Sequence, residues 1–331
     1  MKPQGRVGRH PTMNRRKPRV TTTLLARRAR ALQRFLPAAI RGDDRGVHQA
    51  RVATRRLREA VPVLTTGVKG AKTGKARNKI RRLTRALGTV RELDVTLHIV
   101  DELARRPGIP RNALEDVRAH VVLERDRRRA LMLDRLDQVN SEKLGRRLRA
   151  IGAALSTCDA ETWRQTLATR LLKRARRFGA AVKEAGHMYA PDRLHRVRIA
   201  AKKLRYTLEL AADSGTTAAG PHVRALKRAQ NTLGRLHDLQ VLQHHVAEVQ
   251  AAPPVRRGAQ DGGLDALQRT LEEECRHLHA RYITSYSALL ELSETCRAVI
   301  APQLTRHAAR RLPLLKMTLH ASRPKVSARR A

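Results

Sequence analysis

Hydrophobic and polar positions recur along most of the chain with the 3.6-residue period of an α-helix. Ala, Leu and Arg, which favour helices, are abundant, and no run alternates between polar and β-branched or aromatic residues as a strand does. Stretches containing Gly and Pro divide this pattern. We therefore predict an all-α protein, with helices at about residues 21–40, 45–65, 75–105, 111–156 (broken near 140), 160–188, 192–212, 221–250 and 264–297.

The order of the expected elements occurs twice: a first helix, a helix that opens with a basic motif, a polar loop with glycine, and a long helix containing Leu-Gly. The first motif is His48-x-x-Arg51-x-x-x-Arg55-Arg56-Leu57-Arg58, and the second, 147 residues later, is His195-x-x-Arg198-x-x-x-Lys202-Lys203-Leu204-Arg205. The sequence thus predicts an internal duplication. Repeat 1 covers about 21–156 and repeat 2 about 160–300, between a basic arm at 1–20 and a basic tail at 303–331.

In both motifs the basic side chains share one face of the helix. At about 100° per residue, the histidine and the basic residues three, seven and ten positions later point into one sector, and apolar residues occupy the opposite side. Along each helix the cations extend over roughly 15 Å, which matches a chain-like polyanion better than a single phosphate. One such helix alone is typical of a solvated basic face, but two copies with matching positions favour binding.

The charge balance also points to a polyanion. Lys and Arg number 70 against 29 Asp and Glu, and the formal net charge is +41. Fifteen of the basic residues lie in the acid-free arm and tail, so the remaining 55 still exceed the acids by 26. A folded body with this surplus presents a cationic surface.

Other features narrow the class of function. Aromatic residues make up only 2% of the chain, so stacking platforms for unpaired bases are scarce. Cys158, Cys275 and Cys296 are too far apart for a disulfide framework or the usual zinc spacing, which favours a reducing, cytoplasmic setting. The N-terminal region has no signal-type apolar segment, and no apolar stretch approaches the roughly 18 residues of a membrane span.

The paired motifs resemble those of the CHAD family, the conserved histidine α-helical domain, over about residues 20–300. The resemblance implies a helical bundle with pseudo-twofold symmetry, a basic central groove or pore, and binding of inorganic polyphosphate, often at polyphosphate granules. Binding requires no catalysis, and we expect neither enzymatic activity nor a cofactor. By position, the residues implied to bind polyphosphate are His48, Arg51, Arg55, Arg56, Arg58, His195, Arg198, Lys202, Lys203 and Arg205, with Lys79, Arg82, Arg224 and Lys227 on the long helices as weaker additions.

The chain departs from the family pattern at the Arg-Asp step of the long helices. The first half reads Arg91-Glu92 and the second reads His237-Asp238. We expect these acids to orient neighbouring basic side chains, and Glu92 has a longer side chain than the Asp of the family pattern. Some members are fused to a triphosphate tunnel domain with a Glu-x-Glu-x-Lys motif. That motif is absent, and no hydrolase activity is inferred.

A metal site and nucleic-acid binding are the alternative interpretations. The second long helix carries His237, Asp238, His244 and His245. Asp238 and His245 fall on a different face from the other two, so we expect no metal site. Nonspecific nucleic-acid binding, to which the basic tails would contribute, is the main alternative, because Lys and Arg neutralise phosphates without base contacts. A basic surface that coats storage granules or anionic membranes is a related interpretation.

Overall fold

The computed structural model describes residues 20–68, 70–155, 160–252 and 261–309, and every regular element in these ranges is helical. The prediction of an all-α fold is therefore confirmed for this part of the chain. The helices are α1 (Val20–Ile40), α2 (Asp44–Leu64), α3 (Ala71–Leu103), α4 (Arg111–Asp137), α5 (Ser141–Leu155), α6 (Ala160–Ala185), α7 (Pro191–Asp213), α8 (Ala219–Ala251), α9 (Asp261–Thr284), α10 (Tyr286–Thr295), the π-helical turn η1 (Cys296–Ile300) and α11 (Ala301–Ala309).

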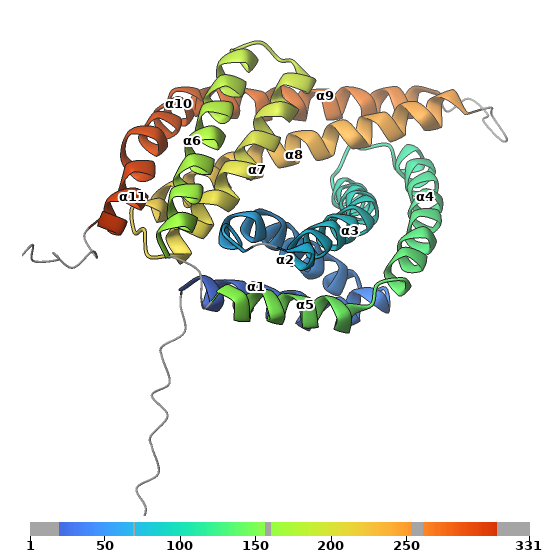
Figure 1. The fold of residues 1–331 in the computed structure, drawn as a ribbon. Coiled ribbons are helices and arrows are strands. Elements are labelled where there is room, and N and C mark those ends of the chain that lie inside the picture. The colour runs from blue at the N-terminus through green and yellow to red at the C-terminus, as the bar shows by residue number, and fades with distance from the viewer. Residues whose placement is uncertain (1–19, 69, 156–159, 253–260, 310–331) are drawn as a thin grey trace, which may run out of the picture.

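The helix α3 lies inside the arrangement and packs against α2, α4, α5 and α8 (Figure 1). The helices α1 and α5 lie side by side along the lower edge of the view, and α8 and α9 lie side by side along the upper edge. The helix α7 packs against α6 and α8 and also contacts α2. The two halves of the chain therefore meet at several places, among them the contacts of α2 with α7, of α3 with α8 and of α4 with α8.

Both motif helices begin one turn before their histidine. Asp43 caps α2, where its side chain accepts a hydrogen bond from the backbone N–H of Gly46. The helix α7 begins with Pro191, whose fixed φ suits the first helical position. His48 and His195 are each the fifth residue of their helix, so the two basic faces start at the same place.

The apolar faces of the motif helices are buried, as the sequence predicts. The buried side chains in α2 include Leu57, Ala60, Val61 and Leu64, and those in α7 include Leu194, Val197, Leu204 and Leu208. Each fully buried Leu or Val side chain stabilises the fold by roughly 1.5–3 kcal/mol. Because packing fixes these faces, it also fixes the opposite faces, which carry the motif cations.

The buried apolar side chains form two clusters. The larger is formed mainly by α1, α2, α5, α6, α7, α10 and α11 with the first halves of α3 and α8. The smaller joins the second halves of α3 and α8 to α4 and α9. Along α3 the change occurs between Val90 and Leu93, and along α8 between Leu236 and Leu239. The acidic positions 92 and 238 thus lie where the two cores meet.

Several boundaries differ from those expected from the sequence. The helix α3 begins at Ala71, ahead of the expected start near 75, and the expected break near 140 separates α4 from α5. The expected helix at 264–297 is divided, because α9 ends at Thr284 and α10 begins at Tyr286. The last helix continues to Ala309, and its Leu304 belongs to the larger core. The helical fold therefore extends into residues that the sequence assigned to the tail.

Other expectations concern residues outside the described ranges. These are residues 1–19 of the arm, residues 310–331 of the tail, and Cys158. Cys275 and Cys296 are buried free thiols, as expected of small core residues. Across the described ranges no helix combines the length and the apolar character needed to span a membrane.

Candidate polyanion-binding site

The basic faces of α2 and α7 meet where the two helices are in contact. Arg51 and Arg55 of α2 and Arg198 and Lys202 of α7 form one group, which we term the central cluster. All four side chains are only partly exposed, and Lys202 experiences the charges of all three arginines. The central cluster therefore joins four of the predicted site residues from both halves of the chain.

Burial and mutual repulsion lower the basicity of the central cluster. Burial lowers the pKa of Lys202 from its ordinary value of 10.5 to about 7, and the charges of Arg198 and Arg55 act in the same direction. Burial also lowers the pKa of Arg51 to about 10, with a further contribution from Arg55. Within the described ranges, Asp238 is the one carboxylate within 4 Å of these four cations, at 3.6 Å from Arg198. The cluster therefore holds positive charge that a bound anion would neutralise.

Three nitrogen atoms at this site are buried without a hydrogen-bond partner among the described residues. They are Nε of Arg51, Nε of Arg198 and Nδ1 of His48. Buried polar groups in folded proteins are nearly always hydrogen-bonded, so each of the three is an exception to the usual pairing. Burial lowers the pKa of His48, and the neighbouring Arg91 and Arg51 lower it further. The imidazole of His48 is therefore neutral at physiological pH.

The two acids of the long helices differ in what they contact. Asp238 of α8 pairs with Arg198, which belongs to the same half of the chain. Glu92 of α3 instead lies 3.5 Å from His237 of α8, measured between Oε1 and Nε2. The hydrogen bond from His237 lowers the pKa of Glu92, whereas burial raises the pKa of Asp238. The longer side chain of Glu92 thus reaches the other half of the chain, whereas Asp238 contacts its own half.

His195 faces His237, a residue that the motif comparison did not include in the site. Their Nδ1 atoms are 3.2 Å apart and their ring centroids 4.6 Å apart. Burial lowers the pKa of His195, and His237 is the next cause. Both rings line a cavity of about 750 Å³ that extends between α4 and α8. The available sequence signal was the match between His237 and Arg91, two basic residues 146 positions apart.

Gly88 and Gly234 lie one turn before the acids, on the same face of each long helix. A Cβ atom added at either position would meet no atom within 4 Å. Because Gly within a helix costs roughly 0.5–1 kcal/mol relative to Ala, neither glycine is explained by packing. Each leaves the backbone open beside an acidic position of the site, where a ligand can approach closely.

Arg56, Arg205 and Arg224, which the resemblance assigned to the central groove, belong to a different surface. Arg56 and Arg205 both pair with Glu209, Arg56 at 3.2 Å. Arg224 and Arg56 line a second cavity of about 590 Å³ between α1, α2, α7 and α8. Arg56 follows Arg55 by one residue, which rotates it by about 100° around the helix. Two of these three cations therefore share one carboxylate, whose single charge balances only one of them.

Arg58 and Lys203 lie beside α6 rather than in the central cluster. Glu59, which is 6% exposed, contacts Arg170 at 2.8 Å and Arg174 at 3.3 Å, while Arg58 is 4.0 Å away. Burial lowers the pKa of Lys203, and the charge of Arg174 lowers it further. We term these four cations around Glu59 the α6 cluster. Arg170 and Arg174, its members on α6, lie outside the duplicated motifs. Their only sequence signal is their four-residue spacing in a predicted helix.

Lys79, Arg82 and Lys227 do not join the central cluster. Lys79 donates a hydrogen bond to the backbone carbonyl of Gln138 at 3.3 Å, and Arg82 and Lys227 are exposed. At about 1.5 Å per residue, all three lie roughly 15–20 Å along their helices from the acidic positions 92 and 238. The spacing along the long helices is thus too large for these weaker candidates to reach the site.

Comparisons with known proteins agree with this fold. The family model described as "CHAD domain" matches residues 23–247, more than half of the chain. The crystal structure of the CHAD domain from the plant Ricinus communis is similar, with 25% identity and a TM-score of 0.54 over 85% of this chain and 91% of that chain. PptA from Streptomyces chartreusis is similar in fold, with 15% identity and a TM-score of 0.56 over 81% of this chain and 98% of that chain. No curated protein matches the sequence.

Proposed function

Because the chain belongs to the CHAD family, we propose that it binds long inorganic polyphosphate at the central cluster and does not transform it. The family resemblance implies this ligand, and the arrangement of α2 and α7 supports it. The observation that carries the proposal is a group of four partly buried cations, drawn from both halves of the chain, with one carboxylate within 4 Å in the described ranges.

An excess of buried positive charge destabilises a fold unless an anion compensates it. The lowered pKa of Lys202 reflects this cost, because burial first and the neighbouring arginines second disfavour its protonated form. A bound phosphate group replaces the repulsion with charge-assisted hydrogen bonds, which are about twice as strong as neutral ones. The partly exposed guanidinium groups of Arg51 and Arg198 supply donors for it. Positive charge at this position is therefore explained by a function in anion binding.

A chain of phosphates fits this surface better than a single phosphate. The α6 cluster continues the basic surface beside α7, and the partly buried Arg91 of α3 continues it beside the neutral His48. Each phosphate that contacts a cation releases counterions and adds binding free energy. Affinity should therefore rise with the length of the polyphosphate chain until the basic residues are all engaged.

The cellular part of the proposal is retention at polyphosphate granules in the cytoplasm. Multivalent binding to a dense phosphate polymer concentrates a protein on that polymer without any further targeting signal. A fluorescent fusion of the full chain should colocalise with granules, and loss of the central-cluster charges should disperse it. A central-cluster variant that stays on the granules would assign the targeting to another part of the chain.

The ligand is tested by competition on the full chain. Labelled long-chain polyphosphate is bound at physiological salt and displaced with unlabelled polyphosphate, duplex DNA or single-stranded RNA at equal phosphate concentration. We expect polyphosphate to be the strongest competitor, and a preference for either nucleic acid would refute the proposed ligand. A second arm reverses four residues to Glu, namely Arg51, Arg55, Arg198 and Lys202. This variant should lose polyphosphate while keeping its helical circular-dichroism signal, and unchanged binding would refute the site.

A further inference from the structure

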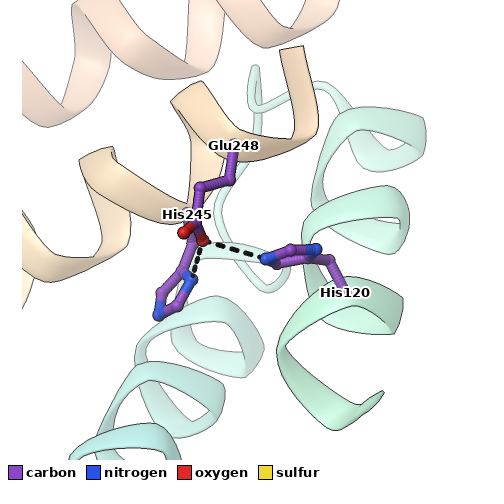
Figure 2. Close-up of side chains that lie close together, drawn as sticks. All are labelled: His120, His245 and Glu248. Carbon is purple, nitrogen blue, oxygen red and sulfur yellow. Dashed lines mark hydrogen bonds and ion pairs between the residues drawn. The ribbon is translucent and has the colours of Figure 1, made fainter. Parts of the chain in front are cut away.

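The carboxylate of Glu248 lies among imidazole rings at one end of the larger cavity. In Figure 2, His120 of α4 and His245 of α8 both point at it. Nε2 of His120 is 3.0 Å and Nδ1 of His245 is 2.8 Å from the same oxygen, Oε2. One potential ligand atom from each of the three residues lies within 4.8 Å of the others. We propose that His120, His245 and Glu248 bind a divalent transition-metal ion of the zinc class.

The residue types and distances suit tetrahedral zinc. With Zn–N and Zn–O bonds of about 2.0–2.2 Å, ligand atoms around a tetrahedral ion are roughly 3.3 Å apart. The two distances to Glu248 Oε2 differ from this value by about 0.5 Å or less. Small side-chain rotations are therefore sufficient to arrange the three groups around an ion. Two His and one Glu also form a ligand set that leaves a fourth position open.

The fold holds the three ligands in place before any ion binds. His245 and Glu248 are three residues apart on α8 and therefore share a helix face. His120 comes from α4, which packs against α8. His245 is 7% exposed, so packing restricts the orientation of its ring, and the two imidazole centroids are 5.6 Å apart. His244 adds a third imidazole, with Nε2 at 3.3 Å from Glu248 Oε1.

The charge around this cluster differs from that of the whole chain. The carboxylates that line the cavity are Glu92, Glu124, Asp192 and Glu248, whereas its Arg residues are Arg127 and Arg128. Arg128 is paired with Glu124 at 2.6 Å. In a protein of net charge +41, a cavity in which acids outnumber Arg and Lys is a favourable environment for a cation. The alternative is a purely structural role, in which the hydrogen bond between His120 and Glu248 holds α4 against α8 and no metal binds.

The site lies in the same cavity as His195 and His237. A metal ion with an open coordination position facing this cavity would take a phosphate oxygen as its fourth ligand. That role rests on the proposed function, whereas metal binding itself does not. The sequence indicated no metal site because the candidate ligands that it places together lie on one helix, and nothing in the sequence brings His120 to Glu248.

Zinc titration of the full chain, prepared without a histidine tag and freed of metal with a chelator, tests the proposal without polyphosphate. Calorimetry should show one tight equivalent of Zn²⁺, and Co²⁺ should give the visible absorption of a tetrahedral site with N and O ligands. His120→Gln and Glu248→Gln should each weaken binding at least tenfold. The matched control is His98→Gln, an exposed histidine of α3, which should bind as the wild type does.

Several results would overturn the metal site. One is that the wild type binds no tight equivalent of Zn²⁺. The others are a thiolate charge-transfer band with Co²⁺ and an undiminished zinc affinity of His120→Gln. Thermal unfolding of the wild type provides a test that needs no variant, because an ion that binds the folded state raises Tm in proportion to the logarithm of its concentration; an unchanged Tm would contradict binding. Polyphosphate binding is measured separately with and without chelator. Its absence in both conditions would refute the proposed function and leave the zinc titration unaffected, whereas binding that persists in chelator supports the proposed function whatever the outcome for zinc.

Discussion

Replacing Lys202 with methionine should stabilise the ligand-free protein. Methionine has a similar length and keeps the packing of the lysine stem, but it removes a charge that burial and three arginines disfavour. The pKa of Lys202 falls from 10.5 to about 7 on folding, which corresponds to about 4 kcal/mol of lost stability at neutral pH. Because the side chain is partly exposed, solvent screening reduces the expected gain to roughly 2–3 kcal/mol.

The pH dependence identifies the cause of this gain. Since the folded-state pKa of Lys202 lies below the unfolded-state value, the protonated lysine destabilises the fold fully below pH 7, and the penalty declines as the pH rises toward 10.5. The gain in stability from Lys202→Met should therefore be largest at acidic pH and vanish near pH 10.5. A gain of 2–3 kcal/mol corresponds to an increase in Tm of roughly 3–5 °C for a chain of this size.

Thermal and urea unfolding at several pH values measure the effect, with Lys143→Met as the control. Lys143 is an exposed lysine of α5, and its replacement should change stability by less than about 0.5 kcal/mol. The same Lys202→Met protein should bind polyphosphate at least tenfold more weakly, because it loses one charge-assisted contact. A destabilised Lys202→Met, or a gain that does not vary with pH, would show that Lys202 is already neutralised and would refute the reasoning.

Three further predictions concern the site and its surroundings. Polyphosphate affinity should fall about tenfold between pH 6 and 8.5, because phosphate binding raises the lowered pKa of Lys202. Lys202→Met should flatten this pH profile, and a flat profile in the wild type would contradict the prediction. Gly88→Ala and Gly234→Ala should each add about 0.5–1 kcal/mol of stability in urea unfolding yet weaken binding in the competition assay, and unchanged binding would show that no ligand approaches the backbone there. Glu59→Gln should cost roughly 2–3 kcal/mol, measured by urea unfolding, because it removes the carboxylate that Arg170 and Arg174 share; a neutral effect would show that solvent screens these arginines.

The sequence was most informative where local pattern alone decides the structure. Helical periodicity predicted the helices, and the duplicated motif identified the central cluster, because positions that share a helix face in two matching helices also share an environment. The positions of Arg51, Arg55, Arg198 and Lys202 follow from that rule. The pseudo-twofold relation between the halves remains a prediction.

Tertiary contacts explain what the sequence could not predict. Arg56 and Arg205 belong to the same motifs as the central cluster, yet both pair with Glu209 on a different surface. His120 meets Glu248 only because α4 packs against α8. The end of α9 at Thr284 has no nearby Gly or Pro to indicate it. In each case the outcome depends on a neighbour that is distant in sequence, or on packing that no local pattern encodes.

The central claim is that polyphosphate binds to the central cluster rather than to positive charge in general. The most direct measurement titrates long polyphosphate into two full-length double variants that each lose one Arg and one Lys. Arg55→Gln with Lys202→Gln alters the central cluster, whereas Arg281→Gln with Lys143→Gln alters exposed cations of α9 and α5. We predict that the first pair loses about 100-fold or more in affinity, from two charge-assisted contacts, and the second less than about threefold. Equal losses in the two variants would contradict the claim.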